Sequence, residues 1–192
     1  MQSAIQEALL ESSELKRQVA TDLAPQIAQA AEMILDSLRA GGTVAFCGNG
    51  GSAADAQHLA GELIGRFRKE RPAYAAIALT TDTSILTAIG NDYGFEQVYA
   101  RQVEGVLREG DVLVAISTSG NAGNCVKAVE KAREQGVRTI GMTGEGGGKL
   151  AQLCDLCLMV PHTVTARIQE VHITIGHILC GLVEDALVEG SG

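Results

Sequence analysis

Short apolar runs rich in β-branched residues alternate with longer amphipathic segments over most of this chain, and this alternation limits its fold more than any other feature. The runs have the length of strands that are buried on both faces. Such strands joined by helices form a parallel sheet covered by helices on both sides, so we expect an α/β fold with a five-stranded parallel sheet. The expected strands are 43–47, 75–80, 112–116, 139–143 and 154–160, and the expected helices begin near residues 52, 82, 94, 121 and 147, with a last long helix over 164–187.

Two further helices are expected before the first strand, within residues 1–40. Apolar residues recur at helical spacing from Leu9 to Leu23, and Pro25 suits the first turn of a second helix, which the pair Gly41-Gly42 ends. The chain has 192 residues with 46% hydrophobic content, enough for one well-buried core, and no linker-like segment divides it. We therefore expect a single domain over residues 1–192.

Composition argues against several classes of partner. The net charge is -8, and the densest basic cluster, residues 66–71, is typical of a solvated helix end and loop, so direct nucleic-acid binding is not expected. With neither an export signal nor an apolar stretch of about 18 residues, we expect a cytoplasmic protein that does not enter the membrane. Cys154 and Cys157 match a C-x-x-C redox or zinc pair, but they lie in an expected strand, and we interpret all five cysteines as reduced thiols.

A glycine-rich turn, residues 48–52, follows the first expected strand and leads directly into a helix. Its backbone N–H groups are accessible to an anionic or polyhydroxyl ligand. The spacing Gly48-x-Gly50-x-x-Ala53 also fits the loose dinucleotide-binding pattern. The acidic residue that this pattern requires about 20 positions later is missing, which makes the dinucleotide interpretation the weaker one.

A second polar turn, Ser117-Thr118-Ser119-Gly120-Asn121, lies between the expected strand 112–116 and a helix. Hydroxyl and N–H groups at a helix N-terminus suit a phosphate, because the helix dipole and the unpaired donors both favour an anion. Simple capping of the helix is the alternative, and a single residue would suffice for it. Three consecutive hydroxyls favour a phosphate monoester.

Two helical segments carry side chains that could transfer protons or bind a metal. His58 and Glu62 lie four residues apart on one helix face, and Gln169 and His177, eight apart, come near one face of the last helix. Together they offer the nitrogen and oxygen ligands of a zinc site with an open position. The same set also suits an aldose–ketose isomerisation, with Glu62 as base and His177 as acid, although a histidine alone is more often a packing residue. The remaining histidines are expected in a loop (His162) and in the core (His172).

Several motifs occur together and in a fixed order: Gly48-Asn-Gly-Gly-Ser52, Gly90-Asn-Asp92, Ser117-Thr-Ser-Gly-Asn121, and Arg167-Ile-Gln-Glu-Val-His172 followed by His177. They resemble the sugar isomerase (SIS) domain family and, within it, the bacterial phosphoheptose isomerases, over nearly the whole chain. The resemblance implies a flavodoxin-like three-layer fold whose N-terminal helices take part in oligomerisation. It also implies conversion of sedoheptulose 7-phosphate to D-glycero-D-manno-heptose 7-phosphate through an enediol, the first step towards the activated heptoses of lipopolysaccharide and other surface glycans.

The resemblance also assigns roles to single residues and implies a homotetramer whose sites are lined by more than one subunit. Glu62 and His177 correspond to the acid–base pair. One zinc ion per subunit is implied, and its ligands correspond to His58, Glu62, Gln169 and His177. The substrate-binding residues correspond to Asn49, Gly50, Gly51, Ser52, Glu62, Asn91, Asp92, Ser117, Thr118, Ser119 and Gln169.

Two positions depart from the family pattern, and two other functions stay open. Ala122 stands where a further phosphate-binding serine is often found, and Ala166 where some members carry an aspartate. The chain also resembles the DnaA initiator-associating protein, a non-catalytic SIS tetramer, but that pattern lacks a histidine at the position of His177. A SIS-type regulator that senses a sugar phosphate would need a DNA-binding segment, for which residues 1–40 are too short and insufficiently basic.

Overall fold

The central sheet confirms the α/β prediction. In the computed structural model, which describes residues 1–190, five parallel strands follow the order β2-β1-β3-β4-β5. This is the flavodoxin-like order, not the order of dinucleotide-binding folds. The central strands β1 and β3 are buried at every residue, as their uninterrupted apolar sequences predict. The strands are β1 (Val44–Gly48), β2 (Ala76–Ala78), β3 (Val112–Ile116), β4 (Arg138–Thr143) and β5 (Leu156–Met159).

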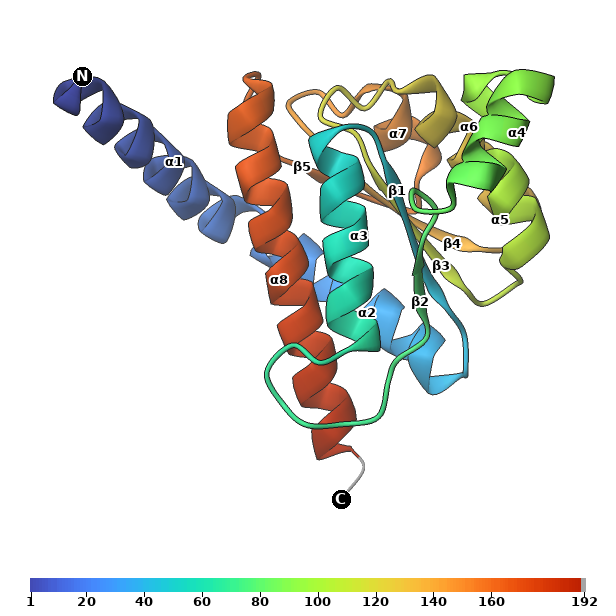
Figure 1. Cartoon of the computed structure of the whole chain (residues 1–192). Coiled ribbons are helices and arrows are strands. Elements are labelled where there is room, and N and C mark those ends of the chain that lie inside the picture. The colour runs from blue at the N-terminus through green and yellow to red at the C-terminus, as the bar shows by residue number, and fades with distance from the viewer. Residues whose placement is uncertain (191–192) are drawn as a thin grey trace.

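Helices cover both faces of the sheet and make three layers (Figure 1). One core joins the sheet to α1 (Gln2–Asp22), α2 (Ala24–Arg39), α3 (Gly51–Ile64) and α8 (Thr165–Glu189). The opposite core lies under α4 (Thr83–Tyr93), the 3₁₀ turn η1 (Phe95–Gln97), α5 (Ala100–Val106), α6 (Gly123–Glu134) and α7 (Gly148–Leu153). Successive strand residues enter opposite cores: Val44 and Phe46 lie in the first, and Ala45 and Cys47 in the second.

Several element boundaries differ from the sequence-based expectation. Strand β2, expected over 75–80, covers only Ala76–Ala78, and three further differences are larger in consequence. The segment expected as one helix from near residue 94 forms η1 and α5, and Gly94, whose positive φ of 89° ends α4, precedes both. Helix α6 begins at Gly123, since the turn after β3 continues through Ala122. The last strand begins at Leu156, because Cys154 still ends α7. All three differences lie at turns, where local hydrogen bonds decide the boundary.

Helix α8 corrects the expectation that nothing in the chain is apolar enough to cross a membrane. By length and composition alone its 25 residues would suffice, with a mean hydropathy of 1.5 in the most apolar window. Half of that window is buried in the protein, however, and residues such as Ile175 and Val183 are almost completely enclosed. Its apolar character is that of a helix that packs one side against α2 and α3 as part of the core.

Candidate active site between helices α3 and α8

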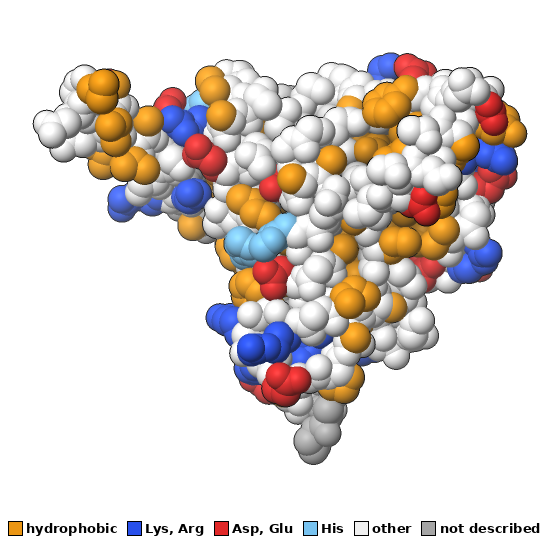
Figure 2. All heavy atoms as spheres, viewed as in Figure 1, with side chains coloured by type: hydrophobic (Ala, Val, Ile, Leu, Met, Phe, Trp, Pro, Cys, Tyr) orange, Lys and Arg blue, Asp and Glu red, His pale blue; other side chains and the backbone are white. Residues whose placement is uncertain are grey.

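Three of the predicted site residues meet where α3 and α8 lie side by side. The Nε2 atom of His58 lies 2.8 Å from Nε2 of His177 and 3.2 Å from Oε1 of Glu62. One potential ligand atom from each residue lies within 4.8 Å of the others. His177 comes from α8, 119 residues after His58. Figure 2 shows histidine side chains with an acidic side chain beside them at the surface, so the cluster is accessible to a ligand.

The close approach of α8 to α3 depends on Gly176. A Cβ atom at this position would lie 2.5 Å from Cδ2 of Leu59, a fully packed side chain in the middle of α3. Both residues of this contact are neighbours of a cluster residue in the sequence, since His58 precedes Leu59 and His177 follows Gly176. The missing side chain at 176 therefore brings the two imidazoles within reach of each other.

The composition and spacing of this cluster fit a zinc ion. Zinc bonds nitrogen and oxygen ligands at about 2.0–2.2 Å in a tetrahedron, which puts two ligand atoms roughly 3.3 Å apart. The distances of 2.8 Å and 3.2 Å around His58 Nε2 are close to that value. Two imidazole nitrogens that face each other also need a proton or a cation between their lone pairs. Two histidines, one carboxylate and an open position are typical of a catalytic zinc site.

Gln169, the fourth predicted ligand, is held beside the cluster by Asp55. Its Nε2 donates to both carboxylate oxygens of Asp55, at 2.8 Å and 2.9 Å. With the amide nitrogen engaged in this way, the oxygen Oε1 is the atom that Gln169 can offer to a cation or a substrate hydroxyl. The amide also packs against Gly51, where a Cβ would lie 3.4 Å from its carbonyl carbon.

Asp55 was not among the site residues predicted from the sequence. Its side chain is buried, and burial raises the pKa of its carboxyl above the usual value, although the hydrogen bonds from Gln169 and the two imidazoles act in the opposite direction. Its spacing in the sequence could have indicated a role, because Asp55, His58 and Glu62 are three and four residues apart and so lie on one face of α3.

The glycine turn after β1 lies at the carboxyl edge of the sheet, as predicted for a ligand loop. Gly50 has a positive φ of 57°, which a residue with a side chain rarely adopts, and Ser52 is buried. Asn49, predicted to contact substrate, exchanges two hydrogen bonds of 2.9 Å and 2.8 Å with the amide of Asn124 at the start of α6. The turn is therefore tied to the helix that follows the serine turn, and Asn124 is a second residue that the sequence analysis missed.

The serine turn also has the predicted position, and its hydroxyls bond backbone N–H groups of the turn itself, before α6 begins at Gly123. The Ser117 hydroxyl accepts from the Ala122 N–H at 3.4 Å, and Ser119 accepts from the Asn121 N–H at 3.2 Å. Thr118 is half-buried and Ser119 is exposed. The two serine hydroxyls lie 3.5 Å apart. These bonds are compatible with phosphate binding, because each hydroxyl that accepts from the backbone still has its own proton to donate.

The turn is rigid because it packs against the loop after β4. Gly120 has a φ of 65°, and a Cβ there would lie 2.0 Å from the carbonyl oxygen of Gly147. Two backbone hydrogen bonds join the loops: the Gly144 N–H donates to the Thr118 carbonyl, and the Leu150 N–H donates to the Gly120 carbonyl. The backbone of the serine turn is therefore held in place by the neighbouring loop.

Asn91 and Asp92 lie apart from this arrangement, on the last turn of α4. Both are exposed, and the Asn91 amide donates to Asp92 at 2.8 Å. Within residues 1–190, no hydrogen bond or ion pair joins either of them to another predicted site residue. A single copy of the chain thus brings together His58, Glu62 and His177, with Gln169 beside them, but leaves Asn91 and Asp92 separate.

The histidines and cysteines interpreted as structural have structural surroundings. His172 is fully buried, and burial lowers its pKa to about 4 while its Nε2 faces the Thr143 carbonyl at 3.0 Å. His162 lies in the loop before α8, where its Nδ1 accepts from the Val164 N–H. Burial raises the pKa of Cys154 to about 12 and also raises that of Cys157, which argues against a reactive C-x-x-C pair.

The chain is similar to proteins that carry an SIS domain. The SIS domain family matches residues 9–144. The phosphoheptose isomerase of Rhodospirillum rubrum is 64% identical over 166 residues, covering 86% of this chain and 88% of the relative, and that of Akkermansia muciniphila is 55% identical over 88% of this chain and 89% of the relative. The structure of a phosphoheptose isomerase from Neisseria gonorrhoeae has a TM-score of 0.91 at 47% identity, over 96% of this chain and 98% of that one.

Proposed function

This chain belongs to the SIS-domain family and, within it, to the phosphoheptose isomerases, and on that premise we propose that it converts sedoheptulose 7-phosphate to D-glycero-D-manno-heptose 7-phosphate. A sugar-phosphate isomerase of heptose biosynthesis is what its relatives indicate. The single observation that carries the more specific proposal is the cluster of His58, Glu62 and His177 between α3 and α8. Isomerisation needs a base for a carbon-bound proton and an acid for an oxygen-bound one, and this cluster supplies both.

Glu62 is the proposed base and His177 the proposed acid. The Glu62 carboxylate takes the proton from the carbon next to the carbonyl and returns it to the neighbouring carbon, through an enediol. The His177 imidazole exchanges the proton of the oxygen. Both side chains are partly exposed on the same surface, with 22% of the Glu62 side chain accessible, so a sugar can contact both.

We infer that His58, Glu62, Gln169 and His177 hold one zinc ion per subunit. Asp55 supports this assignment, because it engages the Gln169 amide nitrogen and leaves the oxygen for the metal. Bound zinc would polarise the sugar oxygens and stabilise negative charge on the enediolate. An elemental analysis that finds no divalent metal in fully active protein would leave only the metal-free acid–base reaction.

The proposed substrate contacts extend from the cluster to both polar turns. The phosphate is expected at Ser117, Thr118 and Ser119, whose backbone is bonded to the neighbouring loop. Sugar hydroxyls are expected at the glycine turn, whose backbone is exposed at Gly50 and Gly51. The remaining proposed contacts are Asn49, Ser52, Asn91 and Asp92.

We further propose a homotetramer in which the N-terminal helices are buried between subunits. Helix α1 extends away from the rest of the protein, and orange apolar side chains gather along it (Figures 1 and 2). Ile5, Leu9 and Leu10 are 54%, 67% and 68% exposed, more than isolated apolar residues on a monomer need be. Light scattering should give a mass four times the 20.0 kDa of one chain, and a monomeric mass would contradict the assembly. We expect this assembly in the cytoplasm.

One assay tests the reaction directly. The protein is incubated with sedoheptulose 7-phosphate in D₂O, and the aldose phosphate is sought by NMR. An enediol reaction should place solvent deuterium at C2 of the product, because the base exchanges its proton with water. A protein that yields no aldose phosphate and instead captures a replication initiator would be the non-catalytic adaptor. Product without deuterium would contradict the enediol reaction with an exchangeable base.

A further inference from the structure

Residues 65–75 form a long loop that leaves the end of α3, crosses α8 and returns to β2 (Figure 1). The loop is anchored on one side chain of α8, Glu184, which is completely buried. Its carboxylate accepts from the backbone N–H groups of Phe67, Arg68 and Lys69, at 2.9, 2.7 and 2.9 Å. Three backbone donors on one carboxylate fix the path of the loop residue by residue.

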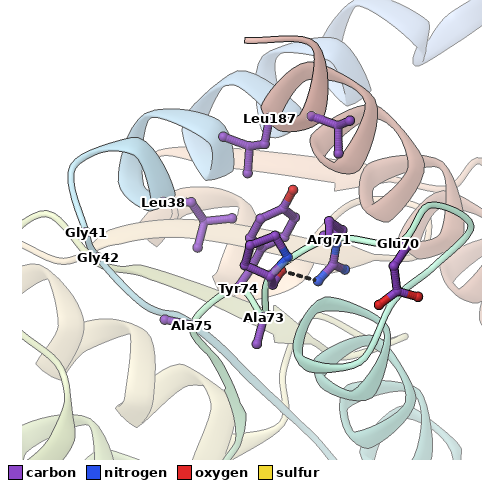
Figure 3. A pocket seen from close by; sticks show the side chains of 11 residues that line it. Leu38, Gly41, Gly42, Glu70, Arg71, Ala73, Tyr74, Ala75 and Leu187 are labelled. Carbon is purple, nitrogen blue, oxygen red and sulfur yellow. Dashed lines mark hydrogen bonds between the residues drawn. The ribbon is translucent and has the colours of Figure 1, made fainter. Parts of the chain in front are cut away.

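Arg71 completes the anchor and connects it to the end of α3. Its Nε lies 3.2 Å from Glu184 Oε1, and both side chains are enclosed, with 2% and 0% exposed. Its terminal nitrogens donate to the carbonyls of Glu62 and Leu63, each at 2.8 Å, in the last turn of the helix. Figure 3 shows the guanidinium beside the Tyr74 ring, 3.9 Å from its centroid, in the wall of a cavity of about 370 Å³. The buried pair thus joins α3, the loop and α8.

The anchored loop places the Phe67 ring on the ring of His177. The two ring centroids are 5.7 Å apart with an angle of 26° between the planes, a stacked arrangement. The His58 ring meets His177 from another direction, at 5.0 Å and 73°. The imidazole of His177 is therefore held between Phe67 and His58, and its Nε2 is aimed at the cluster.

Gly181 makes room for this stack. It lies one helical turn after His177 on the same face of α8. A Cβ there would lie 2.6 Å from Nη2 of Arg68 and 3.3 Å from Cε1 of Phe67, tighter than ordinary contact. A side chain at 181 would therefore displace the Arg68 side chain and shift the Phe67 ring by a few tenths of an ångström.

We propose that Phe67 is a positioning residue for His177, and that the buried Glu184–Arg71 pair holds it in place. The inference rests on the role proposed above for His177. An imidazole that is half-exposed and not restrained on one face has several rotamers available. Stacking on Phe67 selects the rotamer that faces His58 and Glu62, so its loss should weaken metal binding and turnover while substrate binding at the two polar turns changes little.

Phe67→Leu tests this, because leucine keeps an apolar side chain and the backbone N–H to Glu184 but removes the ring. Supporting groups of this kind typically affect metal affinity or activity by about 10–100-fold. We expect about a 10-fold loss of zinc affinity in a competition titration and of kcat, a changed visible spectrum of the cobalt-substituted protein, and a KM within about two-fold of wild type. Phe67→Tyr should restore all of these, since it retains the ring.

Lys69→Ala is the matched control. It lies in the same loop and keeps its N–H to Glu184, but its side chain pairs with Asp185 at the surface, at 2.8 Å. It should bind zinc and turn over as wild type does. Equal losses in Lys69→Ala and Phe67→Leu would show a general effect of the loop and would overturn the proposal. If Phe67→Leu does not fold, Gly181→Ala replaces it and is compared with Arg68→Ala, because the added methyl also meets the Arg68 side chain. A small loss in the same direction, beyond that of Arg68→Ala, is expected from the shifted ring.

The outcomes distinguish a failure of the positioning role from a failure of the proposed function. A wild-type protein that isomerises the sugar and binds zinc, with a Phe67→Leu variant that does both equally well, overturns the positioning role alone. A wild-type protein that does neither overturns the proposed function and the positioning role with it.

Discussion

Helix α3 packs Leu59 and Leu63 against the sheet and α8, whereas α4, which also carries predicted site residues, has no buried residue among the described residues 1–190. His58 and Glu62 on α3 are supported by Gly176, by Arg71 and by the loop held on Glu184. Asn91 and Asp92 on α4 contact chiefly each other. One part of the candidate site is therefore built completely by a single chain, and the other is not.

The difference indicates where the missing part comes from. A helix gains most of its stability from packing of an apolar face, and α4 is poorly supplied with such packing. Tyr93 and Phe95 at its end are 59% and 63% exposed, unusual for large aromatic side chains. We infer that a second copy of the chain covers this region, which agrees with the tetramer proposed for α1.

Glu62→Gln tests whether the α3–α8 part contains the chemistry. Glutamine keeps the size of the side chain but cannot accept a proton as a base. General acid–base groups typically contribute ~10²–10⁴-fold, so kcat should fall by about that factor, measured as formation of the aldose phosphate. The thermal unfolding temperature should change little, because the side chain is partly exposed. Wild-type turnover by a folded Glu62→Gln protein would rule out the proposed base.

Glu184→Ala tests how firmly this part is anchored. Removal of one partner of a buried ion pair typically costs about 3–5 kcal/mol, because the other charge stays buried without compensation. Here Arg71 and three backbone N–H groups would lose their acceptor. We expect a loss of that size in urea unfolding. Lys127→Ala, which removes an exposed pair with Glu130, is the control and should cost less than about 1 kcal/mol.

The same anchor predicts a dependence on pH. Burial raises the pKa of Glu184, but three backbone N–H donors and the Arg71 guanidinium outweigh it and leave the pKa below the usual 4.5. The folded state therefore prefers the charged form of Glu184. The contribution of this carboxylate to the free energy of unfolding is complete above pH 4.5 and is lost as the pH falls below the lowered pKa. If the difference in free energy of unfolding between wild type and Glu184→Ala stayed the same through this acid range, a charged Glu184 would not be what anchors the loop.

The sequence predicted the sheet, its five strands and both polar turns, because these depend on local patterns: uninterrupted apolar runs for the strands, and glycine or serine after them. It also placed His58 and Glu62 on one helix face. It could not predict that Glu184 would anchor a loop more than 110 residues away in the chain, since nothing local in the sequence of α8 distinguishes a buried glutamate from a solvated one.

The resemblance to a family named the ligand set but not the residues that support it. Asp55 lies three residues after the motif Gly48–Ser52, yet its role becomes visible only when α8 brings Gln169 to it across 114 residues. Phe67 lies in the charged segment 66–71, which we interpreted as a solvated helix end and loop. Arg71 and Phe67 are instead turned towards α8. The composition of a segment is an average over its residues. It does not show which of the neighbouring side chains are buried and which are exposed.

Asp55→Ala tests whether that support acts through Gln169. Without the carboxylate, the amide of Gln169 is free to rotate, and zinc affinity should fall by about 10–100-fold. If Asp55 acts only by orienting Gln169, the double variant with Gln169→Ala should bind zinc no more weakly than Gln169→Ala alone. Additive losses would show that Asp55 contributes to the site independently of Gln169.

Phe95→Ser addresses the α4 part and should have the smallest effect on the chain itself. Because Phe95 is exposed in one copy, its replacement should change the free energy of unfolding of that copy by no more than about 0.5 kcal/mol. If a second copy covers this region, however, the tetramer should dissociate at higher protein concentration than wild type does, and activity should fall on dilution and return on concentration. Lys131→Ala, at an exposed ion pair on α6, should show neither change. A Phe95→Ser protein whose mass and activity are independent of concentration would place the subunit contact elsewhere, and Asn91 and Asp92 would then have to reach the sugar from the same chain that carries Glu62.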